Sequence, residues 1–91
     1  MPSKLPKRTF TASQLTPGKT YRLTAPFVDF DGVTHPVGES WRFLGKDFLP
    51  YEDGLTLFLE RDGKSMWLRL QWRRETQGDV IDRFSDFVEE L

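Results

Sequence analysis

The sequence contains no cysteine and only one histidine, His35. The absence of thiols excludes disulfides, a cysteine nucleophile and cysteine-ligated zinc. One imidazole cannot build a multi-histidine metal site, and no apolar run approaches the ~20 residues that cross a bilayer. We therefore expect no metal, no cofactor and no membrane span. The N-terminal residues also lack the apolar stretch of a secretory signal, which favours the cytoplasm.

The chain has 91 residues, enough for one domain and too few for a second core. Aromatic residues make up 14% of it and supply much of the surface available for burial. The net charge of −1 disfavours a general nucleic-acid binder. The first 28 residues nevertheless carry five bases and no acid, whereas residues 79–91 carry five acids and one base. We predict a basic tail over residues 1–8 and one domain over 9–91.

A hairpin is predicted from Leu55 to Trp72. Asp62-Gly63 suits a two-residue type I′ turn, in which both residues need positive φ. Opposed residues then have numbers that sum to 125, as Asp62 and Gly63 do. This register puts leucines on one face and a Phe58–Trp67 pair on the other, and a one-residue slip would mix the two sets. Thr16-Pro17-Gly18-Lys19 predicts a type II turn before another strand.

A C-terminal helix is predicted over residues 79–90, with Asp79 as its N-cap. Val80, Ile81, Phe84, Phe87, Val88 and Leu91 recur at helical spacing. The fold class expected is mainly β with one C-terminal α-helix. The architecture predicted is a small, SH3-like, partly open barrel of four to five strands; the alternative is a bent antiparallel sheet with one packed helix.

No catalytic constellation is evident, so we expect a protein that is not an enzyme. Asp29 and Asp31 could hold a cation, but the other ligands of a calcium loop are missing and aspartate before glycine is ordinary turn chemistry. His35 precedes a proline in a predicted loop. Neither Ser40 nor Ser65 lies in a nucleophile motif that would link it to this histidine.

Two surfaces are candidates for binding a protein or peptide. The first is the Phe58–Trp67 pair, which either lies under the C-terminal helix or is exposed as a partner site. The second is the loop that carries Phe48, Tyr51, Glu52 and Asp53, where aromatic and acidic side chains occur together. The function favoured is a non-catalytic protein- or peptide-binding module.

Two alternatives remain open. Arg69, Arg73 and Arg74, with the basic tail, could bind nucleic acid through phosphate contacts and stacking. The simpler interpretation pairs Arg69 and Arg73 with carboxylates of the C-terminal helix. Association of two copies through Phe58 and Trp67 would instead give a weak homodimer.

Several short motifs resemble a family of small, mostly bacterial proteins known as a domain of unknown function. They are Leu15-x-Pro17-Gly18-x-x-Tyr21, Phe30-Asp31-Gly32, His35-Pro36-x-Gly38-Glu39-x-Trp41-x-Phe43-Leu44-Gly45, Phe48-Leu49-Pro50-Tyr51-Glu52-Asp53-Gly54-Leu55, Leu70-Gln71-Trp72 and Gly78-Asp79-x-Ile81. The resemblance covers most of the chain after residue 9. It implies a family and no mechanism.

Overall fold

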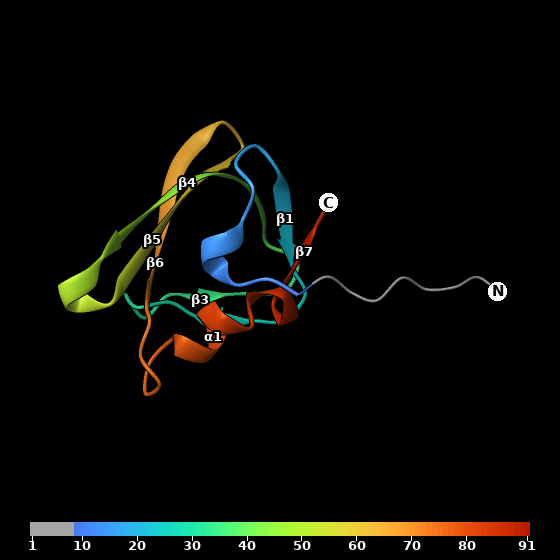
Figure 1. The fold of residues 1–91 in the computed structure, drawn as a ribbon. Coiled ribbons are helices and arrows are strands. Elements are labelled where there is room, and N and C mark those ends of the chain that lie inside the picture. The colour runs from blue at the N-terminus through green and yellow to red at the C-terminus, as the bar shows by residue number, and fades with distance from the viewer. Residues whose placement is uncertain (1–8) are drawn as a thin grey trace.

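The computed structural model describes residues 9–91, so the predicted basic tail, residues 1–8, lies outside the described residues. The protein is mainly β. A five-stranded antiparallel sheet has the order β6-β5-β4-β1-β7, and a small β2–β3 hairpin lies apart from it (Figure 1). The large sheet consists of β1 (Thr20–Leu23), β4 (Ser40–Leu49), β5 (Gly54–Arg61), β6 (Lys64–Gln71) and β7 (Val88–Glu90). The hairpin pairs β2 (Phe27–Val28) with β3 (Thr34–His35).

Four short helical segments connect or cover these strands. They are the 3₁₀ turns η1 (Ala12–Gln14), η2 (Pro50–Glu52) and η3 (Phe84–Asp86) and the helix α1 (Gly78–Asp82). Within residues 9–91 no helix is long and apolar enough to cross a membrane. Figure 1 shows η1 inside the curve of the large sheet, with β3 and α1 across the opening below it.

The predicted β5–β6 hairpin is confirmed. Leu57 pairs with Leu68 and Phe58 with Trp67, as the turn chemistry required. The turn residues Asp62 and Gly63 have φ angles of 53° and 78°. Thr16–Lys19 also forms the predicted turn, in which Gly18 has a φ of 90° and the Lys19 amide donates to the Thr16 carbonyl.

A β-bulge at Leu44 divides β4 into two parts. Before it, Phe43 pairs with Leu59, and after it Gly45 pairs with Phe58. An extra residue in one strand bends the sheet and changes which side chains share a face. The bulge therefore determines which side chains of β4 after Leu44 lie on the inner face of the sheet and which lie on the outer face.

The core lies on the concave face of the sheet, where every strand contributes side chains. Fully buried members include Tyr21, Leu23, Trp41, Phe43, Leu55, Leu57, Leu59, Leu68, Leu70, Ile81, Phe84 and Val88. Rings of Trp41 and Phe84 stack at 6.4 Å. The C-terminal segment thus covers the leucine-rich face and leaves the other face of the hairpin open.

The prediction of one helix over 79–90 is wrong in extent. Helix α1 ends at Asp82, and the chain continues through η3 into β7. Val88 pairs with Leu23 of β1, so the last residues satisfy their backbone groups in the sheet instead of in a helix. The apolar stripe is still buried. Asp79 is not the N-cap either: Gln77 holds that position, without a side-chain hydrogen bond.

The mainly β class with one short C-terminal helix is confirmed. No barrel closure occurs among residues 9–91, because β6 and β7 stand at opposite edges of the sheet order. The large sheet is therefore open along both edge strands.

Candidate functional site

The outer, convex face of the hairpin carries an exposed aromatic pair. Phe58 and Trp67 are 39% and 65% exposed. Of the two alternatives for this pair, cover by the C-terminal helix is wrong, because Ile81, Phe84 and Val88 are buried against the opposite face. On β4 the residue opposite Phe58 is Gly45, which adds no side chain to cover the ring.

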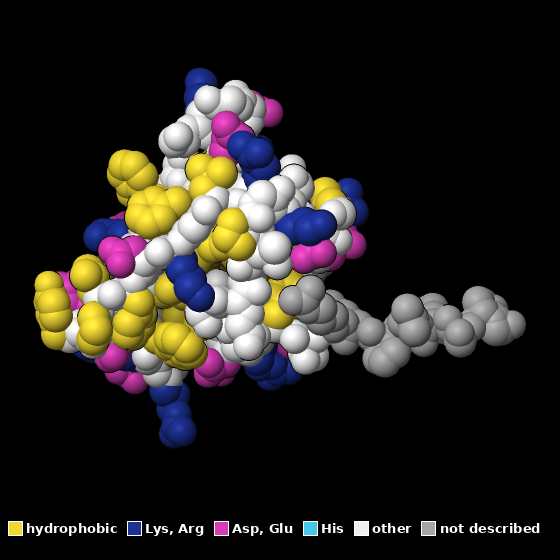
Figure 2. All heavy atoms as spheres, turned by 45° about the horizontal axis from the view of Figure 1, so that its top comes forward, with side chains coloured by type: hydrophobic (Ala, Val, Ile, Leu, Met, Phe, Trp, Pro, Cys, Tyr) yellow, Lys and Arg dark blue, Asp and Glu magenta, His cyan; other side chains and the backbone are white. Residues whose placement is uncertain are grey.

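A groove of about 270 Å³ lies further along the hairpin, where Thr56 and Arg69, the next pair of residues on this face, contribute to its lining. Its floor is hollow because Gly54 lies between Leu49 of β4 and Gln71 of β6 in the register and has no side chain. The residues that line it are Phe30, Leu49, Tyr51, Glu52, Gly54, Leu55, Thr56, Arg69, Leu70, Gln71 and Arg73. Figure 2 shows hydrophobic side chains gathered at the end of the molecule that contains η2.

One wall of the groove comes from η2 and the strand before it. Pro50 begins this 3₁₀ turn and Asp53 ends it in the left-handed region, with a φ of 50°. The tight turn leaves Tyr51 81% exposed and Leu49 40% exposed. An aromatic ring this exposed contributes little to the core, so it is available for contact with a ligand.

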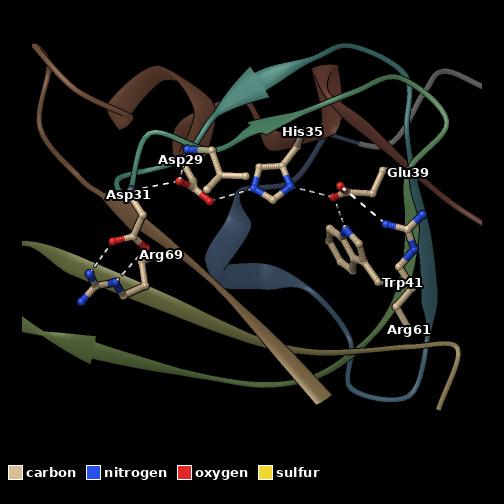
Figure 3. Close-up of polar contacts among 8 residues, drawn as sticks. Asp29, Asp31, His35, Glu39, Trp41, Arg61 and Arg69 are labelled. Atoms are coloured by element: carbon tan, nitrogen blue, oxygen red, sulfur yellow. Dashed lines mark hydrogen bonds and ion pairs between the residues drawn. The ribbon is translucent and has the colours of Figure 1, made fainter. Parts of the chain in front are cut away.

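The other wall is Phe30, in the loop between β2 and β3. Its amide donates to the Arg69 carbonyl at 2.8 Å, and the Arg69 guanidinium lies 5.7 Å from the ring centroid. Arg69 also donates through Nε to Asp31 at 3.1 Å and forms a second bond through its terminal nitrogen (Figure 3). These contacts fasten the loop to the edge strand β6.

The Asp31–Arg69 pair shifts both pKa values. The hydrogen bond from Arg69 is the largest effect and lowers the pKa of the Asp31 carboxyl; desolvation opposes it, and the charge of Arg69 lowers the pKa further. The hydrogen bond to Asp31, followed by the negative charge of Asp31, raises the pKa of Arg69. Both groups are therefore ionised in the folded protein at neutral pH, and the loop remains tied to β6.

Behind this wall lies a buried polar cluster that the sequence did not reveal. His35 is 4% exposed and lies in β3, not in a loop. Its Nε2 is 2.8 Å from Asp29 Oδ2 and its Nδ1 is 2.8 Å from Glu39 Oε2 (Figure 3). Trp41 Nε1 donates to the same Glu39 oxygen at 3.2 Å. The β2–β3 hairpin brings Asp29 to one side of the His35 ring, and the turn from Pro36 to Glu39 brings Glu39 to the other side.

Asp29 and Asp31 do not direct their carboxylates toward a common cation site, because each has different partners. Asp29 uses Oδ2 for His35 and Oδ1 for the amides of Asp31 and Val33, at 2.9 and 3.0 Å. Asp31 instead pairs with Arg69. Among residues 9–91, no group of three or more potential metal ligands has a geometry that could hold an ion.

The structure divides the predicted loop surface. Tyr51 and Glu52 line the groove, whereas Phe48 pairs with Leu55 and so shares the inner-face side of the sheet. There its ring meets Trp72 edge to face at 6.1 Å. Asp53 accepts a hydrogen bond from Arg73 Nε at 3.0 Å.

The predicted pairing of Arg69 and Arg73 with carboxylates of the helix is wrong. Their partners are Asp31 and Asp53, which lie in loops beside the groove. The helix carboxylate of Asp82 instead accepts from Trp72 Nε1 at 2.8 Å. Arg74 is exposed in the segment after β6.

Fold and groove together define a small, mainly β domain with an open antiparallel sheet and a half-apolar groove on its convex face. Residues 7–91 match the family described as a domain of unknown function (DUF3601), and the chain belongs to that family. The resemblance noted in the sequence is therefore confirmed.

A solved structure supports this assignment. The chain is similar to the integron cassette protein VCH_CASS4 from the mobile metagenome of Vibrio cholerae, with 28% identity and a TM-score of 0.84. The similarity covers 91% of this chain and 93% of that one. Among the curated proteins compared, none matches significantly.

Proposed function

We propose that the protein is a non-catalytic binding module that holds a short, extended protein segment in the groove beside Tyr51. The observation that carries the proposal is the hollow over Gly54, walled by the exposed side chains of Tyr51 and Phe30. A surface that leaves several aromatic rings in water without gaining core packing is typical of an interaction site.

The dimensions favour a peptide over a large cofactor. The groove volume of about 270 Å³ is below the range typical of drug-sized ligands, and suits one or two side chains. Along β6, the outer-face residues Trp67, Arg69 and Gln71 span roughly 13 Å, the length of about four residues of extended chain. An apolar side chain would enter the hollow over Gly54, and Gln71 and Glu52 would provide polar contacts at its rim.

Further parts of the proposal concern architecture and location. We propose that the curved sheet, bent at the β4 bulge, is a partly open barrel of the SH3-like type, and that the module acts in the cytoplasm.

Nucleic acid is the less favoured partner, because Arg69 and Arg73 each already pair with a carboxylate. Self-association through Phe58 and Trp67 is the second candidate, favoured by the exposure of this pair.

The test fills the groove without disturbing the fold. A Cβ at Gly54 would lie 3.9 Å from the Cβ atoms of Leu49 and Glu52, an ordinary contact, so the site tolerates a side chain. Gly54→Leu should occupy the hollow, and Gly54→Ala is the matched control that leaves most of it open. The probe is a random-peptide phage library selected on the wild-type protein.

Selected peptides should bind wild type and Gly54→Ala, and lose most of their affinity for Gly54→Leu and Tyr51→Ala. Amide chemical-shift mapping should locate the bound peptide at Thr56, Arg69 and Gln71. The proposal fails if no peptide is enriched, or if a folded Gly54→Leu binds the selected peptides as well as wild type does.

A further inference from the structure

We infer that His35, although buried, positions the Phe30 wall of the groove by acting as a charged bridge between Asp29 and Glu39. The inference rests on the proposed function for its purpose, but its geometry stands by itself. Both ring nitrogens lie 2.8 Å from carboxylate oxygens. Both nitrogens of an imidazole can donate only when the ring is the protonated imidazolium. With both carboxylates ionised, these two contacts require a ring that carries a positive charge.

Asp29 links this bridge to the loop that carries Phe30. Asp29 Oδ2 accepts a hydrogen bond from the His35 ring, while Asp29 Oδ1 accepts hydrogen bonds from the amides of Asp31 and Val33. The main chain of Asp29 closes the same loop, since its amide donates to the Val33 carbonyl at 3.0 Å. Phe30 lies inside this loop, so its ring can remain at the groove only while the loop keeps its shape.

Aromatic rings shield the Asp29–His35–Glu39 bridge from water, and charged side chains lie beyond each of its two carboxylates. Phe27 stacks on the His35 ring at 5.1 Å, and Phe84 and Phe87 pack edge to face on Phe27. Beyond Glu39, the Arg61 guanidinium lies 3.9 Å from its second oxygen. Beyond Asp29 lies the Asp31–Arg69 ion pair. These are the charged groups that face the bridge from the segments packed around it.

Loss of one ring proton would break the bridge on one side. Either tautomer of neutral imidazole then presents a lone pair to a carboxylate oxygen at hydrogen-bonding distance, which is repulsive in a buried site. If the lone pair faces Asp29, this carboxylate moves and its bonds to the amides of Asp31 and Val33 weaken. The Phe30 wall would loosen while the β5–β6 hairpin, which shares none of these bonds, would stay intact.

NMR spectroscopy on the unliganded full chain tests this directly. Nitrogen shifts of the His35 ring should show both nitrogens protonated at neutral pH. When the pH is raised until one proton is lost, the protection of the Asp31 and Val33 amides, measured relative to their base-catalysed intrinsic exchange rates, should fall by about tenfold, the effect expected for one hydrogen bond to a charged group. Contacts between the Phe30 ring and Arg69 should weaken in parallel, with the amides of Leu57 and Leu68 as internal controls.

Two variants separate positioning from general support. His35→Gln keeps a donor for one carboxylate only, and should accelerate exchange in the Phe30 loop at neutral pH without affecting the hairpin. Arg61→Gln, at the rim of the cluster, should leave the loop unchanged. The inference is overturned if the ring has one protonated nitrogen at neutral pH, or if loop and hairpin amides lose protection together.

A binding arm distinguishes this inference from the proposed function. If the selected peptides bind wild type and His35→Gln equally while the Phe30 loop has loosened, the positioning role is wrong and the binding module stands. If no peptide is selected by wild type, the proposed function is wrong, and the NMR result alone decides whether His35 holds the Phe30 wall.

Discussion

Replacing Gly78 by alanine tests the packing at the start of α1. Helix propensity predicts that the substitution stabilises the protein, whereas the contacts in the structure predict that it destabilises it. Alanine is favoured over glycine in a helix by about 1 kcal/mol. Here, however, an added Cβ would lie 2.6 Å from the Arg73 carbonyl oxygen and 2.9 Å from its carbon. The same oxygen accepts the Gly78 amide at 2.8 Å and the Thr76 amide at 3.1 Å, so it cannot withdraw without loss.

The expected result is a net destabilisation. Overpacking against backbone costs about 1–3 kcal/mol, and a weakened hydrogen bond adds about 1 kcal/mol. After the helix gain is subtracted, Gly78→Ala should lower the free energy of unfolding by about 1–3 kcal/mol, or about 4–8 °C in Tm per kcal/mol. Urea unfolding followed by tryptophan fluorescence measures this, since Trp41 is buried in the core.

Gly45→Ala is the matched control for the same chemical change. A Cβ there meets nothing within 4 Å and the backbone needs no positive φ. Reduced freedom of the unfolded chain should make this variant neutral or up to about 1 kcal/mol more stable. A Gly78→Ala protein as stable as wild type would refute the close approach of α1 to Arg73.

Three further predictions follow from the fold and the site. Leu57→Ala, at a fully buried position, should cost about 2–5 kcal/mol in calorimetric or urea unfolding; a smaller loss would mean that the core collapses around the cavity. The pKa of the Asp31 carboxyl is lowered by its hydrogen bond to Arg69, so its stabilising contribution is present above the usual aspartate range and is lost only as the pH falls through the lowered value. A carboxyl-carbon NMR titration should show a midpoint below the usual range, and Arg69→Met should return it there. Replacing both Phe58 and Trp67 by serine should change Tm little and remove any concentration-dependent sedimentation, because the pair covers no core; unchanged association would place the contact elsewhere.

The sequence was sufficient where the determinants of structure are local. Asp62-Gly63 and the alternating leucines lie within one hairpin, and both select the same register. The C-terminal helix was wrong because the choice there is not local. Val88 gains a partner in Leu23 of β1, and a helical period cannot reveal a distant strand that needs a neighbour.

The candidate site was predicted in pieces. Tyr51 and Glu52 were singled out as a partner surface and Arg69 and Arg73 as a basic one, yet all four line the same groove. The opposite wall of this groove is Phe30, from a loop nearly forty residues before Arg69, and its amide donates to the Arg69 carbonyl. Glu39 was missed because no short-range pattern shows that a buried histidine has two acidic neighbours.

The bulge at Leu44 explains why the groove exists at all. With regular pairing continued from Phe43 and Leu59, Phe48 would lie opposite Gly54 on the outer face, and its ring would fill the hollow. The extra residue turns Phe48 to the inner side, where it meets Trp72, and sets the smaller Leu49 beside Gly54. One inserted residue thus converts a covered sheet end into an open groove. A bulge costs ladder hydrogen bonds, and the binding role proposed for the groove would account for its presence in β4.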